Sequence, residues 1–256
     1  MSKKTIADVG MNRTGIKTSP IDSKDVIQEA ARATPSSPGD GQGILEVRKQ
    51  YAREAGDGLG SVPPPSSLKG MAKTAVDMLK GGKPTVFIDK LGERLAFERT
   101  GVRLYEGALS KLDVFGSWEG GPSRELLTKI LDDELSHFAL LVEALEKLGA
   151  DPTAMTPSAD LTAVISMGVP AAISDARTNL RQCMQALLVA ELTDNASWEL
   201  LIDLARGLGH DALADRFQLA LDAEAEHLLL VKSWLAAGVS TEARAPMESA
   251  PVVPAP

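Results

Sequence analysis

The sequence predicts an all-α protein, an antiparallel four-helix bundle made of two helical hairpins that a long crossover joins. Three observations predict it. Aromatic residues are only 4% of the chain, and the abundant leucine and alanine favour helices. Apolar residues recur at spacings of three and four over residues 84–238, which indicates amphipathic helices. Two connections are short, whereas the third, from Gly149 to Ser174, has roughly 25 residues and can cross the length of a bundle.

Composition excludes several classes of function. The net charge is −8 and the pI is near 5.0, which argues against a nucleic-acid partner, since phosphate binding needs a basic surface. The single cysteine, Cys183, excludes an internal disulfide framework and a four-cysteine iron centre. The N-terminal "MSKKTIADVGMNRTG" has no apolar signal region, and no apolar run is long enough to span a membrane. We therefore expect no membrane partner and a cytoplasmic location.

The segments flanking the bundle differ from it in composition. Residues 1–83 contain the clusters "ATPSSPGDGQG" and "GDGLGSVPPPSS", which predict a mostly flexible leader with short helices. The helical candidates begin at Ser23 and Ile44, and a third covers residues 67–82. A docking arm is the alternative interpretation of this leader. The tail, residues 239–256, ends in Pro, Ala and Val and is expected to be disordered.

The first hairpin is predicted from two apolar seams, each a line of apolar residues along one face of a helix. The first helix has its seam between Ile88 and Leu112, and "GSWEGGPS" ends it. Ser123 is a suitable N-cap for the second helix. That helix is expected to end at Gly149, since glycine is common just after a helix C-terminus.

The second hairpin follows the crossover, which we expect to contain a short helix of its own. The third helix is predicted to begin near Asp175 and to end at "GLGHD". The fourth has its seam between Leu213 and Trp234 and is predicted to end at Gly238.

Each of the four seams is interrupted by a glutamate where an apolar residue is expected. A buried glutamate without a partner is strongly disfavoured and takes up a proton instead of staying charged. Two of the glutamates also open a Glu-x-x-His motif in the repeated frames "LDDELSHFALL" and "LDAEAEHLLLV". Four carboxylates that converge at the middle of a bundle with two imidazoles need a cation. The interrupting residues are Glu98, Glu134, His137, Glu191, Glu224 and His227.

The spacing of the motif suits metal binding. Glu-x-x-His on a helix places both side chains on one face, about one turn apart, so that they can bind the same ion. Four carboxylates neutralise two divalent ions, and two imidazoles complete the coordination. The oxygen-rich set suits iron or manganese better than copper or structural zinc.

In this order of motifs the chain resembles the ferritin-like superfamily, and most of all its rubrerythrin-type and other bacterial branches. The resemblance covers residues 84–238. It implies one metal ion bound by Glu98 and His137 and a second bound by Glu191 and His227. Glu134 and Glu224 would then bridge the two ions.

The resemblance also implies roles for residues near the ligands. Tyr105 lies where many relatives have a tyrosine beside the metals, and we expect it to supply an electron or a hydrogen bond. Asp194, three residues after Glu191, takes the place of an additional carboxylate ligand. Asp133 and Asp222 would orient the imidazoles through their second nitrogen, or else are solvated aspartates on the helix faces.

The implied function is oxidation of Fe(II) coupled to reduction of O2 or H2O2, with two iron ions bound. A rubredoxin module is excluded by the single cysteine, so electrons would come from Fe(II) or an external donor. The Pro-rich tail disfavours a storage cage, whose subunits have a further short helix there. Because bundles of this type often pair into dimers, a homodimer is expected. The alternatives are a dimanganese catalase-like enzyme and a non-catalytic helical interaction module.

Overall fold

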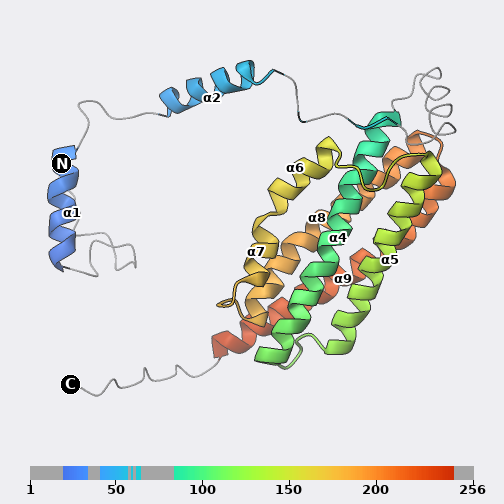
Figure 1. Ribbon diagram of the computed structural model, residues 1–256. Helices are drawn as coiled ribbons and strands as arrows, with labels where there is room; N and C mark the ends of the chain where they lie inside the picture. Colours follow the sequence, from blue (N-terminus) through green and yellow to red (C-terminus); the bar gives the residue numbers. More distant parts are fainter. Residues whose placement is uncertain (1–19, 34–40, 57–58, 60–61, 65–83, 245–256) are drawn as a thin grey trace. The chain divides into compact units, whose positions relative to one another are not determined.

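The computed structural model describes residues 20–33, 41–56, 59, 62–64 and 84–244 (Figure 1). Every regular element among these residues is a helix, which confirms the all-α prediction. None of the described helices is both long and apolar enough to cross a membrane. The chain divides into two units at residues 58 and 59.

The first unit contains helices α1 (Pro20–Ala33) and α2 (Gln42–Glu54). They overlap the two helical segments predicted from Ser23 and Ile44, but each begins two or three residues earlier. The third predicted segment, residues 67–82, lies outside the described residues, as does the end of the chain from residue 245.

Among its described residues, the second unit contains the four long helices of the bundle and two short helices of the crossover (Figure 1). Within each hairpin the two helices are antiparallel and a short turn connects them. Lys111 donates hydrogen bonds to the carbonyls of Asp175 and Thr178, at 2.6 and 2.8 Å. These bonds place the C-terminal end of the first bundle helix beside the N-terminal end of the third. The elements in chain order are α4 (Pro84–Phe115), α5 (Arg124–Leu148), α6 (Pro157–Ser166), α7 (Gly168–Ser174), α8 (Leu180–Gly207) and α9 (Asp211–Arg244).

Local sequence explains where the helices of the first hairpin end. Gly116, with φ +67°, follows α4, and its backbone N–H donates to the carbonyl of Leu112. Ser123 caps α5 by accepting a hydrogen bond from the Leu126 N–H at 3.1 Å, as predicted. Gly149 ends α5 in the left-handed conformation, at φ +80°, which glycine adopts without strain.

The structure corrects two predicted ends of helices. The third bundle helix begins at Leu180, later than the predicted Asp175, because Asn179 and Gln182 form a capping box. The last helix does not end at Gly238 but continues to Arg244. Gly238 is buried within α9, where an added Cβ would lie 3.1 Å from the indole of Trp118. Glycine therefore permits close packing at this position and does not end the helix.

The crossover is fixed to the outside of α4. The Asp89 carboxylate accepts hydrogen bonds from the backbone N–H and the hydroxyl of Ser158, at 2.9 and 2.6 Å. The Thr156 hydroxyl donates to the Asp89 carbonyl at 3.1 Å. Gly92 and Gly107 let the crossover approach, because a Cβ at either position would lie 2.5–2.6 Å from a side chain of this segment.

The buried hydrophobic side chains form two separate clusters. One includes Leu91, Trp198 and Phe217, and the other includes Leu127 and Met184. On α5, α8 and α9 the two clusters are separated by the glutamate that interrupts the seam, and on α4 the change from one cluster to the other falls between Leu95 and Phe97, next to Glu98. The bundle thus has a polar layer near its middle, with a hydrophobic core on either side.

Candidate metal centre

The polar layer brings together all seven residues that the sequence singled out as metal ligands. They come from four helices and are buried, with His137 the most exposed at 7%. Their ligand atoms fall into three groups, within each of which all atoms lie within 4.8 Å of one another. The groups are Glu134, Glu191, Glu224 and His227; Glu98, His137 and Glu224; and Glu98, Glu134, Asp194 and Glu224.

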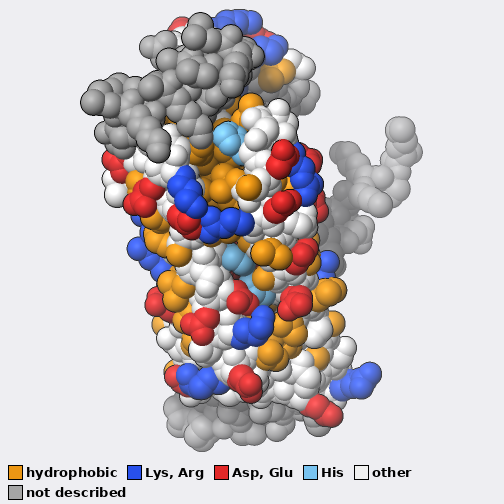
Figure 2. Space-filling view, turned by 90° about the vertical axis from the view of Figure 1, so that its right-hand side faces the viewer, with side chains coloured by type: hydrophobic (Ala, Val, Ile, Leu, Met, Phe, Trp, Pro, Cys, Tyr) orange, Lys and Arg blue, Asp and Glu red, His pale blue; other side chains and the backbone are white. Residues whose placement is uncertain are grey.

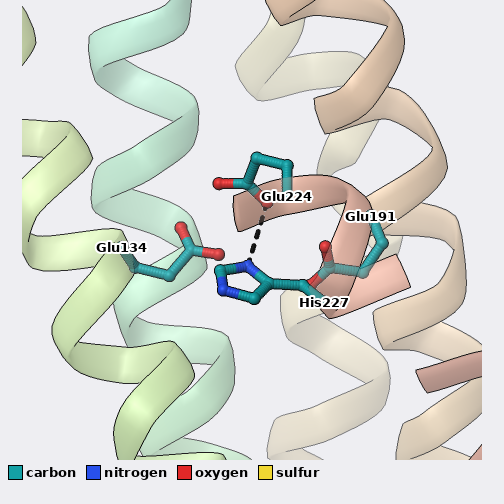
Figure 3. A group of neighbouring side chains, drawn as sticks. All are labelled: Glu134, Glu191, Glu224 and His227. Carbon is teal, nitrogen blue, oxygen red and sulfur yellow. Dashed lines mark hydrogen bonds and ion pairs between the residues drawn. The ribbon is translucent and has the colours of Figure 1, made fainter. Parts of the chain in front are cut away.

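Glu224 is the central carboxylate, because it belongs to all three groups. Its Oε1 lies 2.6 Å from Nδ1 of His137, and its Oε2 lies 3.1 Å from Nδ1 of His227. Figure 3 shows Glu224 above the His227 ring, with the carboxylates of Glu134 and Glu191 directed toward the same space. One carboxylate thus contacts the imidazoles of both Glu-x-x-His motifs, which is the placement expected of a bridging ligand.

Glu134 occupies space that a glycine provides. Its Oε2 is buried without a hydrogen-bond partner among the described residues. A Cβ on Gly101, in the facing helix α4, would lie 2.0 Å from this oxygen. The sequence interpretation did not identify Gly101, although it lies three residues after Glu98 on the same helix face.

A second buried oxygen also lacks a hydrogen-bond partner among these residues, Oε2 of Glu191. Unpaired buried carboxylate oxygens are costly, and a cation beside Glu134 and Glu191 would remove the cost. The donor set is rich in carboxylate oxygen and includes two imidazoles, a combination that suits divalent iron or manganese. The residues therefore fit a pair of metal ions.

Arg94 is the member of this layer that the sequence interpretation missed. It lies on α4, one turn before Glu98, and is only 2% exposed. Its Nε lies 2.9 Å from Oε1 of Glu98, and its Nη2 lies 3.0 Å from Oδ1 of Asp194. The guanidinium also packs over the ring of Phe97, at 4.3 Å from the centroid. Asp194 therefore lies beside the glutamates, as predicted, but it also forms an ion pair with an arginine.

The two aspartates that precede the motifs differ. Asp133 lies 3.1 Å from Nε2 of His227 and also pairs with Lys129 at 2.9 Å. Asp222 is exposed and accepts a hydrogen bond from Gln218 instead. Only the first aspartate of the pair is therefore placed to orient an imidazole.

Tyr105 lies at the opposite end of the layer from Arg94. It is 1% exposed, and its hydroxyl donates a short hydrogen bond to Oε1 of Glu191. Burial and the negative charge of Glu191 raise the pKa of Tyr105 well above its usual value. The tyrosine is therefore neutral and holds one oxygen of a predicted ligand.

The pKa values of the buried carboxylates are shifted in different directions. Burial, together with repulsion from Glu224 and Glu98, raises the pKa of Glu134 well above its usual range. Burial also raises the pKa of Glu191, to about 8. For Glu224 burial acts in the same direction, but hydrogen bonds from His137 and His227 outweigh it and lower the pKa to about 2.

Histidine titration follows from the same contacts. Burial lowers the pKa of His137, but its hydrogen bonds to Glu224 and Glu98 outweigh burial and raise the pKa to about 9. Without metal, the polar layer therefore carries protons on imidazole and carboxylate groups, and a metal ion has to displace these protons in order to bind.

The centre is close to one face of the bundle. Figure 2 shows histidine side chains near the middle of this face, between hydrophobic and charged groups. The seven candidate ligands are at most 7% exposed, so the side chains around them enclose the centre.

The fold and this centre define a ferritin-like four-helix bundle. The sequence profile of the ferritin-like domain matches residues 88–238, which is more than half of the chain. The chain therefore belongs to the ferritin-like family. Comparisons with curated proteins and with solved structures gave no significant match. The rubrerythrin-type branch stays a prediction.

Proposed function

We propose that this protein binds two iron ions in the polar layer and couples oxidation of Fe(II) to reduction of O2 or H2O2. The observation that carries the proposal is the buried set of four glutamates and two histidines from four helices, with unpaired oxygens on Glu134 and Glu191. Iron bound there would supply reversible one-electron chemistry. With H2O2, two Fe(II) give one electron each, two protons are taken up, and two waters are formed.

The ligand groups suggest how the ions are shared. Glu98 and His137 would hold one ion, and Glu191 and His227 the other, since each pair belongs to a different group around Glu224. Glu224 would bridge both ions, because its two oxygens point to the two imidazoles. Glu134 belongs to the groups of Glu191 and of Glu98, which suits a second bridge.

The residues around the ligands orient and insulate them. Asp133 would hold the His227 ring with Nε2 outward and Nδ1 toward the metal. Tyr105 would hold Glu191 and stand ready to supply an electron or a hydrogen bond. The hydrophobic clusters on both sides exclude water from the layer, which strengthens every electrostatic interaction within it.

The first test is the metal content of protein purified without chelator, by inductively coupled plasma mass spectrometry. We expect about two iron ions per chain, and ferric absorbance should appear when O2 or H2O2 is added to the Fe(II)-loaded protein. Manganese in place of iron would favour catalase chemistry instead.

Two variants separate a metal protein from an interaction module. Glu134→Ala should lose most of the bound metal, whereas Glu226→Ala should keep it. Glu226 is the matched control because it lies in the second motif, on α9, with a 69% exposed side chain. If neither the parent protein nor Glu226→Ala takes up Fe(II) or Mn(II) under anaerobic conditions, the proposed function is wrong.

A further inference from the structure

Arg94 gives the polar layer a fixed positive charge at one end. Its guanidinium contacts the Glu98 carboxylate at 2.9 Å and the Asp194 carboxylate at 3.0 Å, and it reaches the Asp194 carbonyl at 3.5 Å. With 2% exposure, it is shielded from water and counterions. Arginine stays charged in proteins and its planar fork suits two carboxylates at once, so this cation is a permanent part of the centre.

The charge is not shared equally by the two predicted metal positions. Oε1 of Glu98 is already paired with Arg94. Its Oε2 makes no hydrogen bond but lies 3.7 Å from Nδ1 of His137. On the other side, Oε2 of Glu134 and Oε2 of Glu191 have neither a hydrogen bond nor an ion pair among the described residues, and the group that contains them also includes His227. A metal ion beside Glu191 gains unpaired oxygens, whereas one beside Glu98 has to share a carboxylate with a cation and is repelled by it.

We propose that Arg94 makes the two metal positions unequal. The position formed by Glu134, Glu191, Glu224 and His227 fills first, and the position at Glu98 and His137 fills second and with lower affinity. Asp194 serves as the partner of Arg94 and not as a metal ligand. Arg94 is in this sense a positioning residue that acts through Glu98. The inference rests on the proposed dimetal centre.

The test is a calorimetric titration of the metal-free full-length protein with Co(II), which needs no oxidation chemistry. The parent protein should show two binding events whose Kd values differ by at least about ten-fold, as expected for an added repulsion within a buried site. Visible absorbance of bound Co(II) would follow the same two events independently.

The variant Arg94→Met/Asp194→Asn removes Arg94 and Asp194 together, so that neither an unpaired arginine nor an unpaired Asp194 carboxylate remains, and Oε1 of Glu98 is freed for the metal. We expect the weak event to tighten by about ten-fold, with the tight event unchanged. Arg103→Met is the control, because it removes the same charge from an exposed position of α4. Unchanged weak binding in the double variant would overturn the role of Arg94.

Two further variants assign the events without altering Arg94. Glu98→Ala should abolish the weak event and leave the tight one, and Glu191→Ala should do the reverse. If Glu98→Ala abolishes the tight event, or if the parent protein binds two Co(II) with equal affinity, the inference is wrong while the dimetal centre stands. If the parent protein binds no Co(II), the dimetal centre itself is refuted and the inference falls with it.

Discussion

At the scale of single residues, side chains next to the proposed ligands determine whether those ligands can reach a metal ion. Gly101 is the clearest case. It lies in the interior of α4, where glycine is less favourable than alanine by about 1 kcal/mol, yet an added Cβ would lie 2.0 Å from Oε2 of Glu134. Glycine is thus needed here to leave space for Glu134, and not to stabilise the helix.

We therefore expect Gly101→Ala to keep or raise the thermal stability of the metal-free protein and to weaken metal binding by about ten-fold or more, because Glu134 has to move. Melting curves and Co(II) titration measure the two effects. Gly207→Ala is the control, since an added Cβ at that position of α8 meets nothing within 4 Å. Equal metal affinity in both variants would show that Glu134 is not a ligand.

Asp133 provides a second prediction at this scale. Asp133→Ala removes the partner of Nε2 of His227 and should reduce metal affinity by about 10- to 100-fold, as loss of a residue that orients a metal ligand usually does. Asp222→Ala changes the equivalent position of the other motif, which is exposed and bound to Gln218. It should leave the affinity unchanged, and a loss of equal size in both variants would contradict the assigned role.

Helical periodicity predicted only those residues of the candidate site that lie in the apolar seams. Glu134 and Glu224 were identified because a carboxylate in an apolar seam has no stabilising role of its own. Arg94 is four residues before Glu98, but an arginine next to a seam usually extends into solvent. Its burial depends on Asp194 from α8, a contact that only the assembled bundle reveals.

At the scale of elements, the ends of the helices follow local capping, and their packing follows small residues. The crossover shows both effects. Thr156 caps α6, and Asp89 of α4 accepts two hydrogen bonds from Ser158 in its first turn. The sequence predicted a short helix here, but not the face of α4 that the helix covers. Gly92 marks that face, because a Cβ there would lie 2.6 Å from Thr156, but this contact exists only in the folded structure.

The docking of α6 can be tested through Asp89. Asp89→Ala leaves the N–H of Ser158 without its acceptor and should lower the free energy of unfolding by about 1 kcal/mol. Chemical denaturation followed by circular dichroism measures it. Asp132→Ala, at an exposed position of α5, should change the free energy by less than about 0.5 kcal/mol. A similar small effect of both variants would mean that the Asp89 carboxylate contributes little to holding α6.

At the scale of the whole molecule, the polar layer makes stability depend on pH. In the metal-free protein burial raises the pKa of Glu191 from 4.5 to about 8, and contacts with Glu224 and Glu98 raise that of His137 from 6.5 to about 9. Both groups bind protons more tightly in the folded state. Their contribution is complete below the unfolded pKa and is lost as pH rises through the folded one.

The melting temperature of the metal-free protein should therefore fall between about pH 5 and pH 9. Glu224, whose pKa is lowered to about 2, acts in the opposite direction but only below this window. Metal binding replaces the protons, so that the difference between loaded and metal-free protein should widen with pH. Differential scanning calorimetry of both forms measures this. A melting temperature of the metal-free form that rises over the window would contradict the assigned protonation.

The separation of the hydrophobic core into two clusters has a further consequence. In the proposed dimetal protein the cross-section at mid-length would be held together by carboxylates and imidazoles around metal ions, whereas hydrophobic contacts hold the sections above and below it. A chain made when metal is scarce would be complete at both ends and weakest in the centre. Since ligands that bind only the folded state protect it from degradation, the amount of this protein in a cell would follow the supply of metal, without any change in its synthesis.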